Sequence, residues 1–208
     1  MKTAISVINT EKINNILFFN PNILKQNDYK RRKYQYLLSE PNDLIIHPSE
    51  EQSEKQKISS FKKFREELYK NIRSSGNFCD GLKALFVKDS LKDCDFILRI
   101  ESSQTRSKKI NGFATLKILK DSKSLYVDVI CTNTDIKGTG TYIINLLSKI
   151  CKLTGLESIK LSATESAIPF YLKMEFECNP LCKMIKPIGG SKTKKNVHNY
   201  NHKTRRRY

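Results

Sequence analysis

A short glycine-containing loop carries the clearest chemical signal in this sequence. Residues 137–141 read Lys-Gly-Thr-Gly-Thr and stand between a β-branched segment and an apolar segment with helical periodicity. At the start of a helix the first backbone N–H groups have no intrahelical partner, and the helix dipole is positive. Because glycines let a phosphate approach such a backbone, the loop can bind a pyrophosphate. The alternative is a plain tight turn between a strand and a helix.

Two common phosphate-binding motifs do not fit this loop. A Walker A motif needs Gly-Lys followed by Ser or Thr, whereas Gly138 is followed by Thr139 and Gly140. A dinucleotide-binding fingerprint needs a third glycine three residues after Gly140, where Ile143 stands. It also needs an acidic residue at the end of the next strand, where Ala163 stands. The sequence therefore excludes both nucleotide-binding folds.

Strands and helices in alternation must position this loop. From β-branched and alternating apolar residues we expect strands at residues 95–101, 111–119, 125–131, 159–163 and, more loosely, 176–188. From apolar residues at helical spacing we expect helices at residues 58–72, 138–155 and 166–173. This order of elements places the chain in the α/β class.

Composition limits what the chain binds and where it works. The 208 residues carry 38 basic and 21 acidic side chains, a net charge of +17 that favours an anionic partner. Only 38% of the residues are hydrophobic and the mean hydropathy is −0.50, so we expect part of the chain to stay unpacked. No apolar run reaches the ~18 residues of a membrane span, and no signal-type segment is seen. We therefore expect an intracellular protein, cytoplasmic or nuclear, that does not contact membranes.

The six cysteines form no metal-binding pattern. No Cys-x-x-Cys pair occurs, and the three histidines lie far from most of the cysteines in sequence. We therefore predict no metal site, and we predict buried, reduced thiols.

Two ordered motifs resemble the GNAT superfamily of acyl-CoA-dependent N-acyltransferases. The family's pyrophosphate motif, Gln/Arg-x-x-Gly-x-Gly/Ala, is similar to the window from Asp135 to Gly140. Its later segment, Ala-x-x-x-Ala-x-x-Phe-Tyr-x-x-x-Gly-Phe, resembles residues 163–176. The resemblance covers residues 95–188 and, loosely, the helix at 58–72. It implies a mixed, splayed central sheet flanked by helices, with acetyl-CoA bound in the splay as co-substrate.

Two positions depart from the family pattern. Asp135 stands where the family has Gln or Arg, and Lys137 offsets the added negative charge. Glu175 stands where a glycine often follows the last helix, which implies a different turn. From these departures we expect weaker acetyl-CoA binding than the family norm.

The resemblance implies which residues hold the co-substrate. Backbone amides of residues 136–141 would bind the pyrophosphate, and the strand end at residues 130–132 would pair with the pantetheine arm. The implied cofactor-binding residues are Ile130, Cys131, Thr132, Ile136, Lys137, Gly138, Thr139, Gly140, Thr141 and Phe170.

Two side chains are candidates for proton transfer. The resemblance implies that Tyr171 protonates the departing CoA thiolate, and the alternative is an aromatic residue packed beneath the co-substrate. Asp128 lies in a β-branched strand, on the face of Tyr126 and Ile130, and is the candidate to take the ammonium proton. A buried carboxylate is costly without a partner, which indicates a wet cleft or a cationic substrate. The alternative is an Asp paired with a lysine at the sheet rim.

The implied reaction is N-acetyl transfer from acetyl-CoA to a primary amine, by direct attack in a ternary complex. The amine would belong to a protein lysine, a protein N-terminus or a small molecule. Residues 136–147 are somewhat similar to protein lysine acetyltransferases, which favours lysine. The alternative is a catalytically decayed GNAT-fold protein that binds nucleic acid or serves as a structural, virion-associated module.

The ends of the chain fall outside the resemblance. We expect residues 1–57 to be an N-terminal extension of unclear structure, 58–188 the GNAT-like acetyltransferase domain, and 189–208 a disordered basic tail. The tail carries seven Lys and Arg residues and no acid, and removing its charge from +17 leaves +10. Nucleic acid or another polyanion is its expected partner. It resembles glycine-led basic tails of large DNA viruses, which favours a viral protein in a host cell.

Overall fold

An eight-stranded sheet organises the computed structural model, which describes residues 6–7, 13–19, 45–47, 53–74, 78–79, 82–102, 109–179 and 183–189. The strand order is β3-β2-β4-β5-β6-β8-β10-β9. In that order the strands are Ile45–His47, Ile13–Phe19, Phe96–Ser102, Ile110–Leu119, Ser124–Thr132, Ser158–Ser162, Lys183–Pro187 and Glu177–Cys178. A separate parallel pair joins β1 (Ser6–Val7) to β7 (Ile136–Lys137). Because parallel and antiparallel pairs share the main sheet, the predicted mixed α/β class is confirmed.

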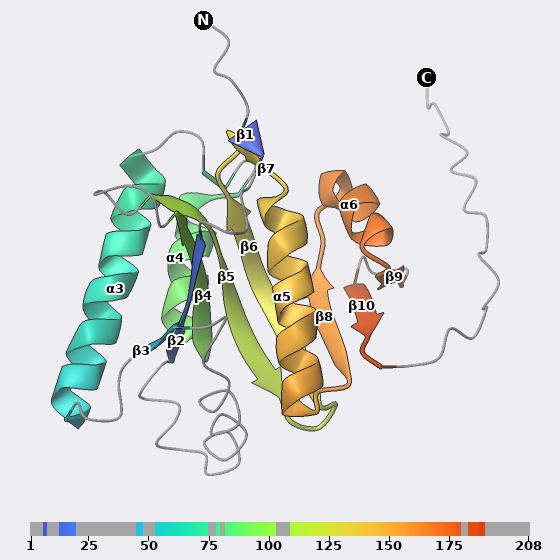
Figure 1. The fold of residues 1–208 in the computed structure, drawn as a ribbon, viewed down its shortest axis with the longest axis horizontal. Coiled ribbons are helices and arrows are strands. Elements are labelled where there is room, and N and C mark those ends of the chain that lie inside the picture. Colours follow the sequence, from blue (N-terminus) through green and yellow to red (C-terminus); the bar gives the residue numbers. More distant parts are fainter. Residues whose placement is uncertain are drawn as a thin grey trace, which may run out of the picture.

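Helices cover both faces of this sheet (Figure 1). α3 (Glu54–Ser74) and α4 (Ala84–Asp93) pack on one face, and α5 (Thr139–Thr154) crosses the other. A short 3₁₀ turn (Glu165–Ala167) leads into α6 (Ile168–Lys173), which follows β8. The main sheet is therefore the middle layer of three.

Alternation along β4 and β5 divides the core in two. On the α5 face, Leu98 and Ala114 are fully buried with Ile143 and Leu147 of the helix; on the α3 and α4 face, the fully buried residues are Ile97, Phe113, Leu68 and Val87. Side chains of successive strand residues point to opposite faces, so both helical layers are anchored to the same two strands.

Several elements of the fold, among them β2 and α4, have no counterpart among the predicted ones. β2 pairs antiparallel with β4, so residues assigned to the N-terminal extension enter the main sheet. Asn15 of β2 also hydrogen-bonds to the Tyr142 hydroxyl of α5, at 2.8 Å. α4 has exposed Leu85 and Phe86 and a buried Ser90, which removes the amphipathic pattern that a sequence search relies on.

The remaining predicted elements are present with small shifts. β4, β5, β6, β8, α3 and α5 lie within a few residues of their predicted limits, and Gly155 ends α5 in the left-handed conformation. The segment 176–188 forms two short strands, β9 and β10, where one loose strand was predicted. The predicted domain boundaries remain a prediction, and the tail beyond Gly189 lies outside the described residues.

β6 is paired with β8 over only half of its length. The parallel ladder runs from the Ser124–Ser158 pair to the Val127–Leu161 pair and then stops. On its other side β6 stays paired with β5 through Thr132, but the register shifts. Thr115 faces Val129 and Leu116 faces Val127, so Asp128 is an extra residue in β6, a β-bulge. A bulged strand bends, and here the bend begins where the pairing with β8 ends.

Buried hydroxyl groups stabilise the bulge. The Val129 N–H donates to Thr115 Oγ1 at 3.0 Å. Thr115 Oγ1 also hydrogen-bonds to Ser90 Oγ of α4. Since all three residues are buried, α4 is fixed to the strand at the position of the bulge.

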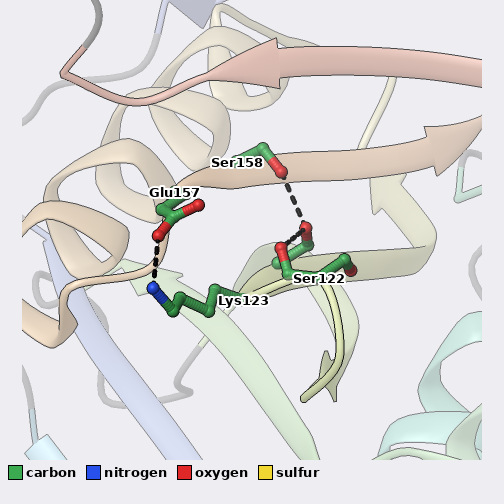
Figure 2. A network of polar contacts seen from close by, with 5 residues as sticks. Ser122, Lys123, Glu157 and Ser158 are labelled. Atoms are coloured by element: carbon green, nitrogen blue, oxygen red, sulfur yellow. Dashed lines mark hydrogen bonds and ion pairs between the residues drawn. The ribbon is translucent and has the colours of Figure 1, made fainter.

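The opposite end of the β6 and β8 pair is held closed (Figure 2). Ser124 Oγ lies 2.7 Å from Ser158 Oγ and also donates to the Ser122 carbonyl. Lys123 Nζ lies 2.8 Å from Glu157 Oε1, but both side chains are exposed, so this ion pair adds little stability. The two strands therefore diverge from a fixed end.

We predict that Thr115→Val destabilises the protein, because it leaves the buried Val129 N–H without an acceptor. The expected loss is about 1–3 kcal/mol in the free energy of unfolding, measured by urea denaturation. Thr164→Val is the matched control, since Thr164 is exposed and its surface substitution should change stability by less than about 0.5 kcal/mol. Equal stability of Thr115→Val and the parent chain would contradict this account of the bulge.

Candidate functional site

Two adjoining cavities occupy the region where β6 and β8 diverge. We call the larger one, about 530 Å³, the strand cavity; residues 126–130 of β6, Phe86 of α4 and the segment after β8 line it. We call the other, about 390 Å³, the loop cavity; residues 136–140 and Phe170 of α6 line it. Four residues line both cavities: Ile130, Thr132, Thr134 and Tyr171. The two cavities therefore form one continuous cleft.

The glycine loop lies at the start of α5, as the sequence predicts. Gly138 precedes the helix with a φ of 89°, a left-handed conformation that glycine adopts without steric cost. The first intrahelical bond runs from the Tyr142 N–H to the Gly138 carbonyl, at 2.9 Å. The amides of residues 139–141 precede that bond, so they have no acceptor within the helix.

Gly140 lets α6 approach this helix start closely. A Cβ built on Gly140 would lie 3.3 Å from Cζ of Phe170, which is tighter than an ordinary van der Waals contact. Phe170 packs against the core on the α5 face and contributes one wall of the loop cavity. The absence of a side chain at Gly140 thus sets the distance between the start of α5 and Phe170 at this end of the loop cavity.

Asn133 shapes the turn from β6 into the loop. Its side-chain Oδ1 accepts a hydrogen bond from the Asp135 N–H, and its carbonyl accepts one from the Ile136 N–H, at 2.9 and 3.1 Å. Its own N–H donates to the Asn111 carbonyl at 2.8 Å. The Ile136 N–H is therefore already hydrogen-bonded within the protein, and Ile136 contributes to the wall of the loop cavity. No sequence motif singled out Asn133, because its role depends on this turn.

Most of the implied cofactor-binding residues line the loop cavity. They are Ile130, Thr132, Ile136, Lys137, Gly138, Thr139, Gly140 and Phe170. Thr141 is exposed on the first turn of α5, beside that cavity. The side chain of Cys131 is buried in the core on the α3 and α4 face, so only its backbone is available to the cleft.

Cys131 is joined to Cys79 by a disulfide, with the two Cα atoms 4.6 Å apart. The prediction of reduced thiols is wrong for this pair. The Cys79 N–H donates to the Thr132 carbonyl, and Phe78 bridges to Asn133, so the segment after α3 lies against the end of β6. Cys79 and Cys131 are 52 residues apart in sequence, so no local pattern indicates that they lie side by side. Cys94 and Cys151 are buried, and Cys178 is exposed.

Asp128 lines the strand cavity at the bulge. It is half-buried, and within the described ranges its carboxylate has no hydrogen-bond or ion-pair partner. Among the described residues that line this cavity, Asp128 is the one with a formal charge at neutral pH. The lysine-paired alternative therefore finds no support in the described part of the chain.

The bulge changes the face pattern that the sequence predicts for β6. Leu125 and Val127, before the bulge, belong to the core on the α5 face. Val129 and Cys131, after it, belong to the core on the other face, although strict alternation would group all four. Ile130 consequently packs toward α5 and does not share a face with Tyr126. The extra residue reverses the alternation.

Tyr171 lies where the strand and loop cavities meet. Its ring makes edge contacts with Phe170 and Phe176, with centroids 5.0 and 5.4 Å apart. Burial raises the pKa of Tyr171 to about 12, so the phenol keeps its proton at neutral pH. A protonated hydroxyl group therefore lies at the junction of the two cavities.

Two further observations concern membranes and metals. None of the described helices is long and apolar enough to cross a membrane. Among the described residues, no group of three or more His, Cys, Asp or Glu side chains is placed to hold a metal ion.

Comparison with known proteins finds similarity in structure but not in sequence. No family model and no curated protein matches this chain. A nourseothricin acetyltransferase structure is 15% identical over 44% of this chain and 64% of its own, with a TM-score of 0.37. Tetrahymena GCN5 is 12% identical over 64% of this chain and 88% of its own, with a TM-score of 0.44. Ard1 from Thermoplasma volcanium is 14% identical over 58% and 93%, with a TM-score of 0.42. These similar structures are GNAT N-acetyltransferases, the superfamily that the sequence motifs resemble. Because the identities and TM-scores are low, the function of this chain is argued from the residues of its cleft.

Proposed function

We propose that this protein is a GNAT-type N-acetyltransferase that transfers an acetyl group from acetyl-CoA to a primary amine. One observation carries the proposal: a glycine-led helix start and the part of β6 that continues beyond its ladder with β8 line the same cleft. The helix start offers N–H groups and a positive dipole to a pyrophosphate. Residues 128–131 of β6 offer backbone N–H and C=O groups to the two amides of a pantetheine arm, whereas the Thr132 carbonyl already accepts the Cys79 N–H.

The residues of the cleft fit acetyl-CoA on geometric grounds. Gly138 is in a conformation that favours glycine, and a Cβ at Gly140 would lie 3.3 Å from Phe170 Cζ, a tight contact. Exposed Lys137 lines the loop cavity, where its charge favours phosphate groups. The strand cavity adjoins the end of the expected pantetheine path and leaves room for an acceptor.

Acetyl-CoA, when bound, supplies a thioester whose C–S bond breaks as the new C–N bond forms. Asp128 is placed to attract the ammonium form of the acceptor and to take its proton, directly or through water. The amine must be neutral to attack, and the Asp128 carboxylate is the one charged group among the described residues that line the strand cavity. Tyr171 holds its proton at neutral pH and donates it to the sulfur that leaves.

The second candidate is a protein that keeps this fold for binding nucleic acid or for a structural role. The net charge of +17 and the acidic Asp135 beside the glycine loop favour it. Binding of acetyl-CoA separates the two candidates, because a decayed site has no need to retain it. The basic tail, residues 189–208, remains a proposed contact for polyanions.

We predict that acetyl-CoA stabilises the folded protein through the glycine loop. At 100 times its Kd a ligand adds about 2.7 kcal/mol, which a thermal shift assay detects as a higher Tm. Gly138→Val should abolish the shift, because a β-branched residue resists the left-handed conformation and blocks the approach of phosphate. Gly155→Asn, at the left-handed residue that ends the same helix, should keep the shift. An unchanged Tm of the parent protein at millimolar acetyl-CoA contradicts the proposed function.

We predict separate kinetic defects for the two proton-transfer residues. Tyr171→Phe should lower kcat by about 10²-fold with little change in acetyl-CoA affinity, as for other general acids. Asp128→Asn should lower the rate most at low pH, where the amine is charged, and the defect should shrink toward the amine pKa near ~10. Glu157→Gln, at an exposed carboxylate outside the cleft, is the control. Parent rates for both variants across about pH 6 to 9 would refute the assigned roles.

A further inference from the structure

α4 presents two large apolar side chains to the surface beside the cleft. Leu85 is 66% exposed and Phe86 is 47% exposed, whereas Val87, Ser90 and Leu91 form the buried face of the helix. A single exposed apolar side chain is ordinary on a protein surface. Phe86 is different because it also lines the strand cavity, which contains Asp128. An apolar ring and a carboxylate therefore line the same cavity.

The position of Phe86 relative to Asp128 is fixed by buried contacts. Ser90, one helical turn after Phe86, hydrogen-bonds to Thr115, which also accepts the Val129 N–H at the bulge. The same bulge carries Asp128. The helix that presents the ring and the strand that presents the carboxylate are thus one rigid unit.

The chemistry of the strand cavity matches one kind of amine. The strand cavity has an apolar wall that includes Phe86, Leu82 and Ala167, and Asp128 contributes a carboxylate. An alkyl-ammonium with a single charge on an apolar stem complements both features. A polyamine would be matched by several carboxylates, and the described residues that line this cavity supply one. The nitrogen of an α-amine is attached to the backbone Cα, so it lacks the long stem that carries a lysine nitrogen past the ring.

The net charge of the protein indicates which charged residues should flank the amine in the acceptor. A chain of net charge +17 repels a strongly basic acceptor and attracts an acidic one over the Debye length. Lys83 and Lys88 of α4 are exposed on either side of Leu85 and Phe86 in sequence. An acceptor segment with acidic residues beside an apolar one would complement this helix.

We infer that the acceptor is the side chain of a lysine in a protein segment with an apolar neighbour and acidic flanks, and that Phe86 positions its alkyl stem. This inference rests on the proposed function. The lysine nitrogen forms a bond to the acetyl carbon and loses a proton, and CoA leaves as the thiol. Phe86 contacts the substrate and takes no part in proton transfer.

The test compares acceptor amines at saturating acetyl-CoA, with CoA thiol release and product mass as readouts. The probes are a peptide with one lysine between a leucine and glutamates, the same peptide with arginines for glutamates, a peptide with only an α-amine, and spermidine. We expect kcat/KM for the acidic lysine peptide to exceed that of each other probe by about tenfold or more. A preference for spermidine or for the α-amine overturns the inference.

Phe86 variants test the role of the ring. Phe86→Ala should raise KM for the lysine peptide by about tenfold with a smaller change in kcat, and Phe86→Leu should restore most of the loss. The acetyl-CoA thermal shift of both variants should equal that of the parent. Leu153→Ala, at another exposed apolar residue on α5 away from the cavities, should leave KM unchanged. An unchanged KM in Phe86→Ala overturns the inference.

The outcomes separate this inference from the proposed function. If acetyl-CoA shifts the Tm and another amine is preferred, only the lysine assignment is wrong. If acetyl-CoA gives no shift and no acetylated product forms, both the function and the inference are wrong.

Discussion

The β-bulge at Asp128 is the constraint on which the cleft depends. A strand with one extra residue bends, and β6 bends at the point where its ladder with β8 stops at the Val127–Leu161 pair. A regular β6 could continue this ladder, and the backbone groups of residues 128–131 would be used within the sheet. The bulge leaves those groups outside the ladder with β8, while the other side of the strand stays bonded to β5.

The rest of the fold keeps the bend in place. Thr115 bonds to the backbone of the bulge and to Ser90 of α4, and Ser124 with Ser158 holds the opposite end of the strand pair closed. The two cores, one on each face of β4 and β5, fix α5 and α4 to the same strands. The helix start that would bind phosphate and the helix that carries Phe86 are therefore both set relative to one strand edge. The packing of α4 and α5 on β4 and β5 thus determines the geometry of the cleft.

Local patterns in the sequence predicted the elements that local physics determines. β4, β5, β6 and α5 have clear periodicity, and Gly138 needs a conformation that favours glycine, so both the strands and the loop were predictable. α4 was not predicted because Leu85 and Phe86 are exposed, so the helix lacks a clear amphipathic pattern. The position of Phe86 at the strand cavity becomes visible only in the folded structure. The bulge and the Cys79–Cys131 disulfide depend on residues distant in sequence, and no local pattern carries that information. The faces of β6 were predicted incorrectly for the same reason.

Hydrogen exchange of the full chain with and without acetyl-CoA measures the central claim most directly, since it reports on the backbone groups of the cleft residue by residue. The account predicts slower exchange in acetyl-CoA at the end of β6 and at the first turn of α5, because the ligand would cover the strand edge and the free amides together. Exchange in α3, which lies on the other side of the sheet, should not change. Protection confined to other segments, or none at saturating acetyl-CoA, would contradict the claim that the bend in β6 builds an acetyl-CoA site.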